Sequence, residues 1–287
     1  MDKRFHPAMA AIQSGDFETF KALIAEDPSL ATSRSTRSHP TLLQCLVLDG
    51  KDKPKAVEMA EVLIGAGAEL NEPFVAAASI DNRPVAELLL DRGAAIDGTG
   101  GWTALEEALY WNSQNVLALL LERGAKIQNL RTAAGLGRTD LIEAYFNADG
   151  SLKPEAGRID WPFGDLKMIA ASNHPPNGKQ SLSDRINEWS QDQQGIVNNA
   201  FVYACMHGHL DAAKLLLGKG AQINAIPGGF DFAGTGLHYA ALNGHRPMVQ
   251  FLLDHGADRT IKDTKVASTP AGWAEHGGHA DLLDLLR

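Results

Sequence analysis

Residues 88–97 read Leu-Leu-Leu-Asp-Arg-Gly-Ala-Ala-Ile-Asp, and close copies of this phrase return at residues 119–128 and 215–224. Looser copies occupy residues 62–71 and 251–260. A phrase that repeats about every 33 residues is typical of a solenoid, in which each unit buries its apolar face only against its neighbours. The repeat therefore predicts the architecture first, and it directs the search for function to the surface of the stack.

The charge balance is acidic, since 35 Asp and Glu face 26 Lys and Arg and leave a formal net charge of −9. This argues against a general surface for nucleic acid or for an anionic membrane. No apolar run reaches the roughly 18 residues of a membrane span, and residues 1–7 lack the apolar core of a signal peptide. Cys45 and Cys205 fall in apolar helical contexts, as reduced core thiols do. We therefore expect a soluble, cytoplasmic protein.

Residues 235–258 show the logic of one repeat most completely. Thr235 is a candidate N-cap for a first helix, because its hydroxyl can accept from an orphan N–H of the first turn. Gly244 is placed to end that helix in a left-handed conformation, and Pro247 stands where a second helix can begin. Gly256 ends the second helix in the same way, and a polar, turn-rich finger follows.

The pattern Thr-x-Leu-His-x-Ala-Ala-x-x-Gly-His, followed by Leu-Leu and Gly-Ala-Asp, resembles the ankyrin repeat. This resemblance implies an all-α fold, a solenoid of stacked helix-turn-helix units with β-turn or hairpin fingers. It spans nearly the whole chain and implies a single domain over residues 1–287 with about eight recognisable repeats. The sequence as a whole resembles uncharacterised bacterial ankyrin-repeat proteins, which imply no activity. We call Gly244 a turn mark, because it stands in the turn between the first and second helix of its repeat. The equivalent turn marks are Gly15, Gly50, Asp81, Asn112, Gly137, Gly208 and Gly278.

Two features depart from a uniform array. The Thr-Pro-Leu-His tetrad of the family is nowhere intact, and the histidine that the resemblance implies as a bridge between repeats maps only to His238. The step from Gly137 to Gly208 is 71 residues, whereas most steps are 31 to 36. Residues 147–194 are therefore either an insertion or a degenerate repeat with a long loop, and we favour the degenerate repeat.

The resemblance implies that partners are held by the fingers and by the exposed end of each first helix. The fourth repeat places three aromatic residues there, Trp102, Tyr110 and Trp111, and such residues are frequent interface hot spots. The alternative is that one or two of them pack against a neighbouring finger or against residues 147–194. Equivalent positions and possible lids complete the expected partner-binding set: Ile80, Leu136, Met206, His207, Trp161, Phe163, Phe230 and Phe232.

The residues favour a non-catalytic protein-binding module on the concave face, with no cofactor and no metal. His209, His245 and His279 each follow a turn mark, where the repeat itself favours histidine, and the tight histidine pairs lack Cys or carboxylate partners at metal-site spacing. The alternative is an enzyme or small-ligand binder with a pocket in residues 147–194. Its candidate residues are Asp160, Trp161, Asp165, His174 and Trp189.

Overall fold

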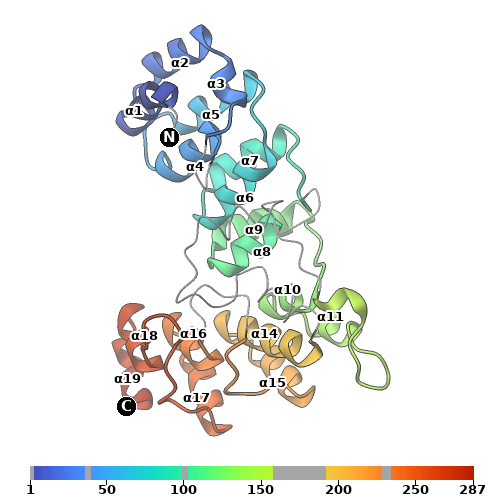
Figure 1. Ribbon diagram of the computed structural model, residues 1–287. Helices are drawn as coiled ribbons and strands as arrows, with labels where there is room; N and C mark the ends of the chain where they lie inside the picture. The colour runs from blue at the N-terminus through green and yellow to red at the C-terminus, as the bar shows by residue number, and fades with distance from the viewer. Residues whose placement is uncertain (1–2, 36–39, 99–102, 158–191, 228–233) are drawn as a thin grey trace. The chain divides into compact units, whose positions relative to one another are not determined.

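The computed structural model describes residues 3–35, 40–98, 103–157, 192–227 and 234–287 (Figure 1). All regular secondary structure in these ranges is helical, and the one isolated β-bridge joins Phe146 and Leu152. The expected all-α class is confirmed. The chain divides into two compact units, and the described part of unit 1 ends at Lys126 while unit 2 begins at Ile127. The single domain expected over residues 1–287 stays a prediction.

Unit 1 contains four helix pairs in its described residues. Along one side the first helices pack in the order α1, α4, α6 and α8, and along the other the second helices pack in the order α2, α5, α7 and α9. The bounds are η1 Lys3–Phe5, α1 His6–Ser14, α2 Phe17–Glu26, α3 Ser29–Thr32, α4 Leu42–Asp49, α5 Ala56–Gly65, α6 Asn71–Ser79, α7 Arg83–Asp91, α8 Ala104–Tyr110 and α9 Gln114–Glu122.

Unit 2 repeats the scheme, with first helices in the order α10, α14, α16 and α18 and with α11, α15 and α17 beside them. The last pair closes with a 3-10 turn and one short helix. The bounds are α10 Leu130–Gly135, α11 Thr139–Ala144, η2 Pro154–Gly157, α14 Gln193–Met206, α15 Leu210–Gly218, α16 Gly236–Leu242, α17 Arg246–Asp254, α18 Pro270–His276, η4 Ala280–Leu282 and α19 Leu283–Leu286.

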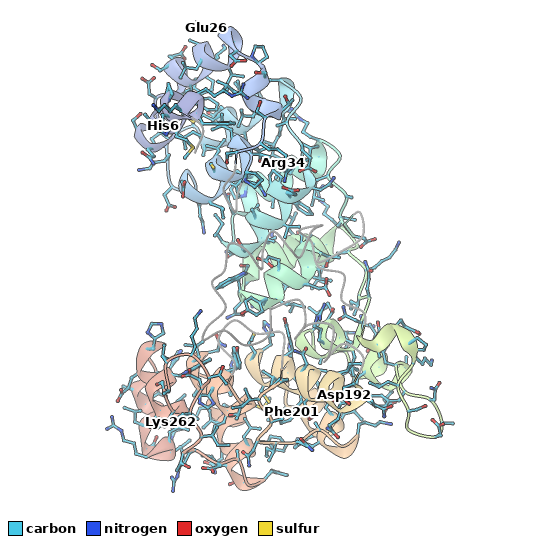
Figure 2. The ribbon with its side chains drawn as sticks, viewed as in Figure 1. His6, Glu26, Arg34, Asp192, Phe201 and Lys262 are labelled. Carbon is cyan, nitrogen blue, oxygen red and sulfur yellow. The ribbon has the colours of Figure 1, made fainter. Side chains whose placement is uncertain are left out.

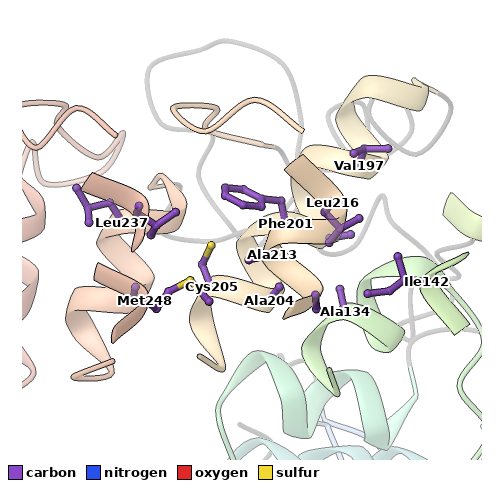
Figure 3. Close-up of a cluster of buried hydrophobic side chains, with 14 of the residues drawn as sticks. Ala134, Ile142, Val197, Phe201, Ala204, Cys205, Ala213, Leu216, Leu237 and Met248 are labelled. Carbon is purple, nitrogen blue, oxygen red and sulfur yellow. The ribbon is translucent and has the colours of Figure 1, made fainter. Parts of the chain in front are cut away.

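The core of unit 2 is one continuous apolar cluster that crosses every helix pair. Figure 3 shows Phe201 and Cys205 of α14 between Leu237 and Met248 of the following pair and Ala134 of the preceding one. Alanines on the first helices allow the close approach that such stacking requires. Burial raises the pKa of the Cys205 thiol, so this cysteine behaves as a core residue and not as a nucleophile.

The long step between Gly137 and Gly208 is explained by direct contacts between described helices. α10 packs against α14, and α11 packs against α15. The His209 ring also reaches the backbone oxygen of Gly135 at 3.0 Å. The two helix pairs are therefore immediate neighbours in the stack, and no further pair separates them. This favours an insertion at residues 147–194 over the degenerate repeat that the spacing of the turn marks suggests.

Side chains that cap the first helices also form hydrogen bonds between repeats. The backbone N–H and the hydroxyl of Thr235 both contact Nδ1 of His238, at 3.1 and 2.9 Å. Nε2 of the same ring lies 3.2 Å from the oxygen of Ser268 in the next repeat. Because a carbonyl can only accept, Nε2 carries the hydrogen and Nδ1 accepts. The bridge expected at His238 is confirmed.

In three copies, the last residue of the repeated phrase ties its finger to the next. Its side-chain oxygen accepts the backbone N–H of the eighth residue in the following copy, a role that suits Asn and Asp. This contact accounts for Asn71, Asp97 and Asn224, whereas Gln128 and Thr260 end the other two copies. The bonds run from Ala95 to Asn71 at 2.8 Å, from Lys126 to Asp97 at 2.7 Å and from Asp258 to Asn224 at 2.8 Å.

In unit 2 the histidines that follow three of the turn marks, His209, His245 and His279, pack on the turn of the preceding repeat. Nε2 of His245 lies 2.9 Å from the oxygen of Met206, as Nε2 of His209 lies close to that of Gly135. A Cβ added to Gly208 would lie 3.0 Å from the His245 ring, and one added to Gly244 would lie closer still to the His279 ring. These turns therefore require glycine for their left-handed φ and also for the space that the ring occupies.

We predict that Gly244→Ala destabilises the protein more than Gly256→Ala. Both glycines have positive φ, 71° and 88°, so alanine costs about 1–2 kcal/mol at either position from the backbone alone. Only Gly244 faces a ring, which adds about 1–3 kcal/mol of overpacking. Urea unfolding measures the difference. His279→Ala added to Gly244→Ala should remove part of the excess, and equal losses in the two single variants would contradict the packing argument.

We also predict that the free energy of unfolding falls as the pH drops below about 6.5, the ordinary pKa of histidine. Burial lowers the pKa of His209, His238 and His245, although their carbonyl bonds partly oppose it. Their stabilisation is complete above the ordinary value, where the unfolded rings are neutral. It is lost as the pH falls towards the lowered pKa values, because the unfolded rings take up protons first.

Urea unfolding at about pH 7.5 and about pH 5.5, followed by circular dichroism, tests this dependence. His245→Gln should show a smaller loss between the two pH values, whereas His276→Gln, which replaces an exposed ring, should keep the parent loss. A free energy of unfolding that does not change between the two pH values would contradict the prediction.

Candidate interaction surface

Two adjacent aromatic rings lie at the C-terminal end of α8, the first helix of the fourth repeat. Tyr110 is the last residue of α8 and Trp111 is its C-cap. Their ring centroids are 5.1 Å apart with an interplanar angle of 83°, an edge-to-face arrangement. The Trp111 side chain is 52% exposed, and Tyr110 is half-buried. An exposed tryptophan held by a second ring is a candidate contact for a partner.

The local sequence holds this pair firmly. Thr103 and Glu106 form a reciprocal capping box at the start of α8. The indole N–H of Trp111 donates to Oε1 of Glu107 at 2.9 Å. Asn112 then takes φ 56°, which ends the helix. Because its polar edge is satisfied within the helix, Trp111 offers mainly an apolar ring face, and little ordering remains to be done on binding.

The positions equivalent to Tyr110 and Trp111 in the other repeats are not uniformly exposed. Ile80, the C-cap of α6, is half-buried, and α6 packs against α8. In unit 2 Leu136 and His207 are half-buried, and the His207 ring stacks 6.3 Å from that of His209. Met206 is only 3% exposed. The expectation that Met206 belongs to the partner-binding set is corrected, because the last turns of α14 are enclosed by their neighbours and leave Met206 in the core.

Five expected contact residues lie outside the described residues: Trp102, Trp161, Phe163, Phe230 and Phe232. The same holds for the residues of the alternative pocket: Asp160, Asp165, His174 and Trp189. Among the described residues, the expected aromatic surface consists of Tyr110 and Trp111.

Two further exposed apolar side chains escaped the sequence analysis. Leu121 on α9 is 44% exposed, and Val266 is 62% exposed. Val266 sits on a loop held by the buried carboxylate of Asp263, which accepts from the backbone N–H groups of residues 265, 266 and 268 and from the indole N–H of Trp273. Desolvation opposes ionisation of Asp263, yet these four donors outweigh it and lower its pKa to about 2.

Most charged side chains of the second helices in unit 1 pair across repeats. Arg83 contacts Glu122 at 2.8 Å, and Arg123 contacts Glu87 at 2.9 Å. Outside the second helices, Arg34 (Figure 2), which follows α3, pairs with Glu72 of α6 at 2.9 Å. Exposed pairs of this kind contribute about 0–1 kcal/mol each. They compensate charge along α7 and α9, whereas Glu18 and Glu26 of α2 and Glu58 of α5 are exposed and make no ion pair with a described residue.

Within the described ranges, no group of three or more His, Cys, Asp or Glu side chains is arranged to hold a metal ion. No described helix is both long enough and apolar enough to cross a membrane. His209, His238 and His245 instead bind the backbone of neighbouring repeats. These three histidines therefore hold neighbouring repeats together.

Comparisons with known proteins identify the repeat. A family model described as ankyrin repeats in three copies matches residues 47–130, and a second, described as ankyrin repeats in many copies, matches residues 201–253. Such repeats generally mediate protein–protein interaction. Each match includes described helix pairs, one set in unit 1 and one in unit 2.

The similar proteins are eukaryotic and much longer. The mask-1 protein of Caenorhabditis elegans, named for ankyrin repeats and a KH domain, is 28% identical over 303 residues, which cover 99% of this chain and 11% of that protein. Human palmitoyltransferase ZDHHC13 is 43% identical over 61 residues, 21% of this chain and 10% of that protein. The mouse serine/threonine-protein kinase TNNI3K is 37% identical over 92 residues, 29% of this chain and 11% of that protein.

The chain thus spans about a tenth of the length of these relatives, so the activities of the full-length proteins are not assigned to it. The resemblance to bacterial proteins stays a prediction, since these three relatives come from a nematode, human and mouse. The repeat itself is settled by the family matches together with the observed helix pairs. The chain therefore contains ankyrin repeats, confirmed over residues 47–130 and 201–253.

Proposed function

We propose that this chain is a non-catalytic protein-binding module whose central contacts are Tyr110 and Trp111. The observation that carries the proposal is the half-exposed Trp111 ring, which is packed edge-to-face on Tyr110 and bonded to Glu107. Tryptophan and tyrosine are enriched among the few residues that dominate interface energies. The edge-to-face packing on Tyr110 and the bonded indole N–H hold the exposed ring face in one position, so little ordering is lost when a partner covers it.

In this proposal the partner approaches along the concave side, where the ends of the first helices and the fingers lie. Ile80 occupies the position equivalent to Trp111 in the preceding repeat and extends the apolar surface within unit 1. Leu136 and His207 are the corresponding candidates in unit 2. A cytoplasmic location belongs to the same proposal. The candidates that remain on sequence grounds are Trp102, Trp161, Phe163, Phe230 and Phe232.

We expect the double variant Tyr110→Ala/Trp111→Ala to keep the fold and to lose partner capture. Both side chains lie at the surface end of α8, so their removal leaves the buried Leu105 and Leu109 in place. Affinity capture from the native cell, compared between parent and variant by quantitative mass spectrometry, measures the loss. Truncating one interface hot spot costs about 2 kcal/mol or more, which corresponds to at least about 30-fold in affinity.

Leu121→Ala is the matched control, because it removes an exposed apolar side chain from the second helix of the same repeat. It should leave capture unchanged. If the double variant captures the same proteins in the same amounts as the parent, while circular dichroism shows both to be folded, the assignment of Tyr110 and Trp111 is wrong.

A further inference from the structure

The N-terminal cap of α16 is built on a side chain that titrates. Nδ1 of His238 accepts the backbone N–H of Thr235 at 3.1 Å, and Nε2 donates to the backbone oxygen of Ser268 at 3.2 Å. The backbone N–H can only donate and the carbonyl can only accept, so a single neutral tautomer of the ring satisfies both contacts. A second proton would place an N–H on Nδ1, and a donor would then face the N–H of Thr235.

The ring cannot avoid this conflict by turning in place. In the charged form both ring nitrogens are donors, so either orientation directs an N–H at the backbone N–H of Thr235. The Thr235 hydroxyl, 2.9 Å from Nδ1, can reverse its role and accept, whereas the backbone group cannot. His238 is also 0% exposed, and a Cβ added to Gly234 would lie 2.9 Å from its Cβ. A charged ring therefore reaches water only by leaving the cap.

The corresponding caps of unit 1 use acceptors that do not depend on a neutral imidazole. On α4, Oε1 of Gln44 accepts the backbone N–H of Thr41 at 3.1 Å. Nε2 of the same amide donates to Glu72 in the next repeat at 3.2 Å. On α8 the acceptor is the Glu106 carboxylate. Gln44 thus makes both kinds of contact that His238 makes, but from a side chain that does not titrate.

His238 also joins α16 to the last repeat. Trp273 of α18 packs edge-to-face on its ring, with centroids 5.2 Å apart. The indole N–H of Trp273 donates to Oδ2 of Asp263 at 3.0 Å, and the same oxygen accepts the backbone N–H of Ser268 at 2.9 Å. Ser268 in turn offers its carbonyl to His238. The loop of residues 261–269 and α18 are therefore held to α16 through one ring and one carboxylate.

Burial opposes the charged form of His238. It lowers the pKa of the ring and outweighs the Ser268 carbonyl and the Asp263 carboxylate, which both favour the charged form. The elements packed against α16 are α14, α17, α18 and the loop of residues 261–269. Their other titratable side chains are buried on α14 (Tyr203 and Cys205) and exposed elsewhere: Arg246, Asp254, His255, Lys262, Lys265, Glu275 and His276.

We propose that His238 is an acid-sensitive switch: when its ring takes up a second proton, the ring leaves the cap of α16, and α18 with the loop of residues 261–269 separates from α16. Unit 1, where α4 and α8 are capped without imidazole, keeps its stack. This opening is local, whereas the pH dependence of the free energy of unfolding involves all three buried rings. It requires no partner, so it is independent of the proposed function.

The direction of the response follows from the ordinary pKa of histidine. Above about pH 6.5 the ring is neutral in the closed and in the open state, and the closed state keeps its contacts. As the pH falls below that value the open state takes up protons first, so its population rises. The Asp263 carboxylate, with a pKa of about 2, stays ionised throughout and does not cause the opening.

Hydrogen–deuterium exchange of the full chain, followed by mass spectrometry, measures the opening. Protection is corrected for the intrinsic exchange rate and compared at about pH 7.5 and about pH 5, on either side of the ordinary histidine pKa. Protection of residues 261–276 should fall at least about fivefold relative to residues 42–49 of α4. That factor is the lower limit expected for one buried hydrogen-bonding group left without a partner.

His238→Gln is the decisive variant, because Gln44 shows that an amide can make both contacts in this chain. It should keep residues 261–276 protected at both pH values. His245→Gln is the matched control, since it removes another buried ring of unit 2 that contacts a carbonyl but caps no helix. It should leave the fall in protection of residues 261–276 as large as in the parent.

NMR of the parent chain gives a second measurement that needs no variant of His238. The ring nitrogens of His238 report its protonation, and the indole N–H of Trp273 reports the closed state of α18. Trp273→Phe identifies the indole signal. We expect the ring to stay neutral while the native Trp273 signal persists, and to become protonated as that signal is lost.

Three results overturn the inference. The first is the same fall in protection of residues 261–276 in His238→Gln as in the parent. The second is an equal fall in α4 of unit 1. The third is a His238 ring that becomes protonated while the Trp273 signal stays native, and this result holds even if His238→Gln does not fold. None of them changes the partner-capture experiment on Tyr110 and Trp111, which tests the proposed function separately.

Discussion

The contact that each helix pair makes with the backbone of the next pair is the constraint on which the rest of the structure depends. No pair has enough apolar surface to fold alone, so neighbours must pack and must also hold one register. In unit 2 that register is set by His209, His238 and His245, whose rings reach carbonyl oxygens of adjacent repeats. Fingers add a second tie through the side chains that end the repeated phrase: Asn71, Asp97 and Asn224.

The two units satisfy the same constraint with different side chains. In unit 2 a ring from the next repeat fills the space over the turn, as His245 does over Gly208, and only glycine fits beneath it. In unit 1 the corresponding turn carries Asp81 at φ 56°, and its carboxylate binds the backbone of the next repeat directly. Short polar residues tolerate the left-handed conformation, so the loss of glycine there is compensated by a new hydrogen bond.

The structural roles of these side chains explain where a functional site can lie within the described residues. Histidines commonly serve catalysis or metal binding, but His209, His238 and His245 are bonded to the backbone of neighbouring repeats, and Cys205 is buried in the core. Surface arginines of α7 and α9 are paired with carboxylates. The surface of unit 1 also presents the exposed ring of Trp111, on which we base the proposed protein-binding role.

The sequence by itself determined the helix pairs, their turns and most of their caps, because these depend on local patterns. The roles of Thr235 and Gly244 follow from spacing within one repeat, whereas the role of His238 was implied by the resemblance to the ankyrin repeat. Periodicity also located the aromatic pair, since the end of a first helix can be counted from the turn mark.

Only the tertiary structure decided which of the counted residues are exposed and which helix pairs are neighbours. Met206 and Tyr110 both stand two residues before a turn mark, yet Met206 lies in the core and Tyr110 is half-buried. Burial depends on the residues that approach from other repeats, and a local pattern does not contain them. The same reason applies to residues 147–194, because contact between α10 and α14, not sequence length, shows which helix pairs are adjacent.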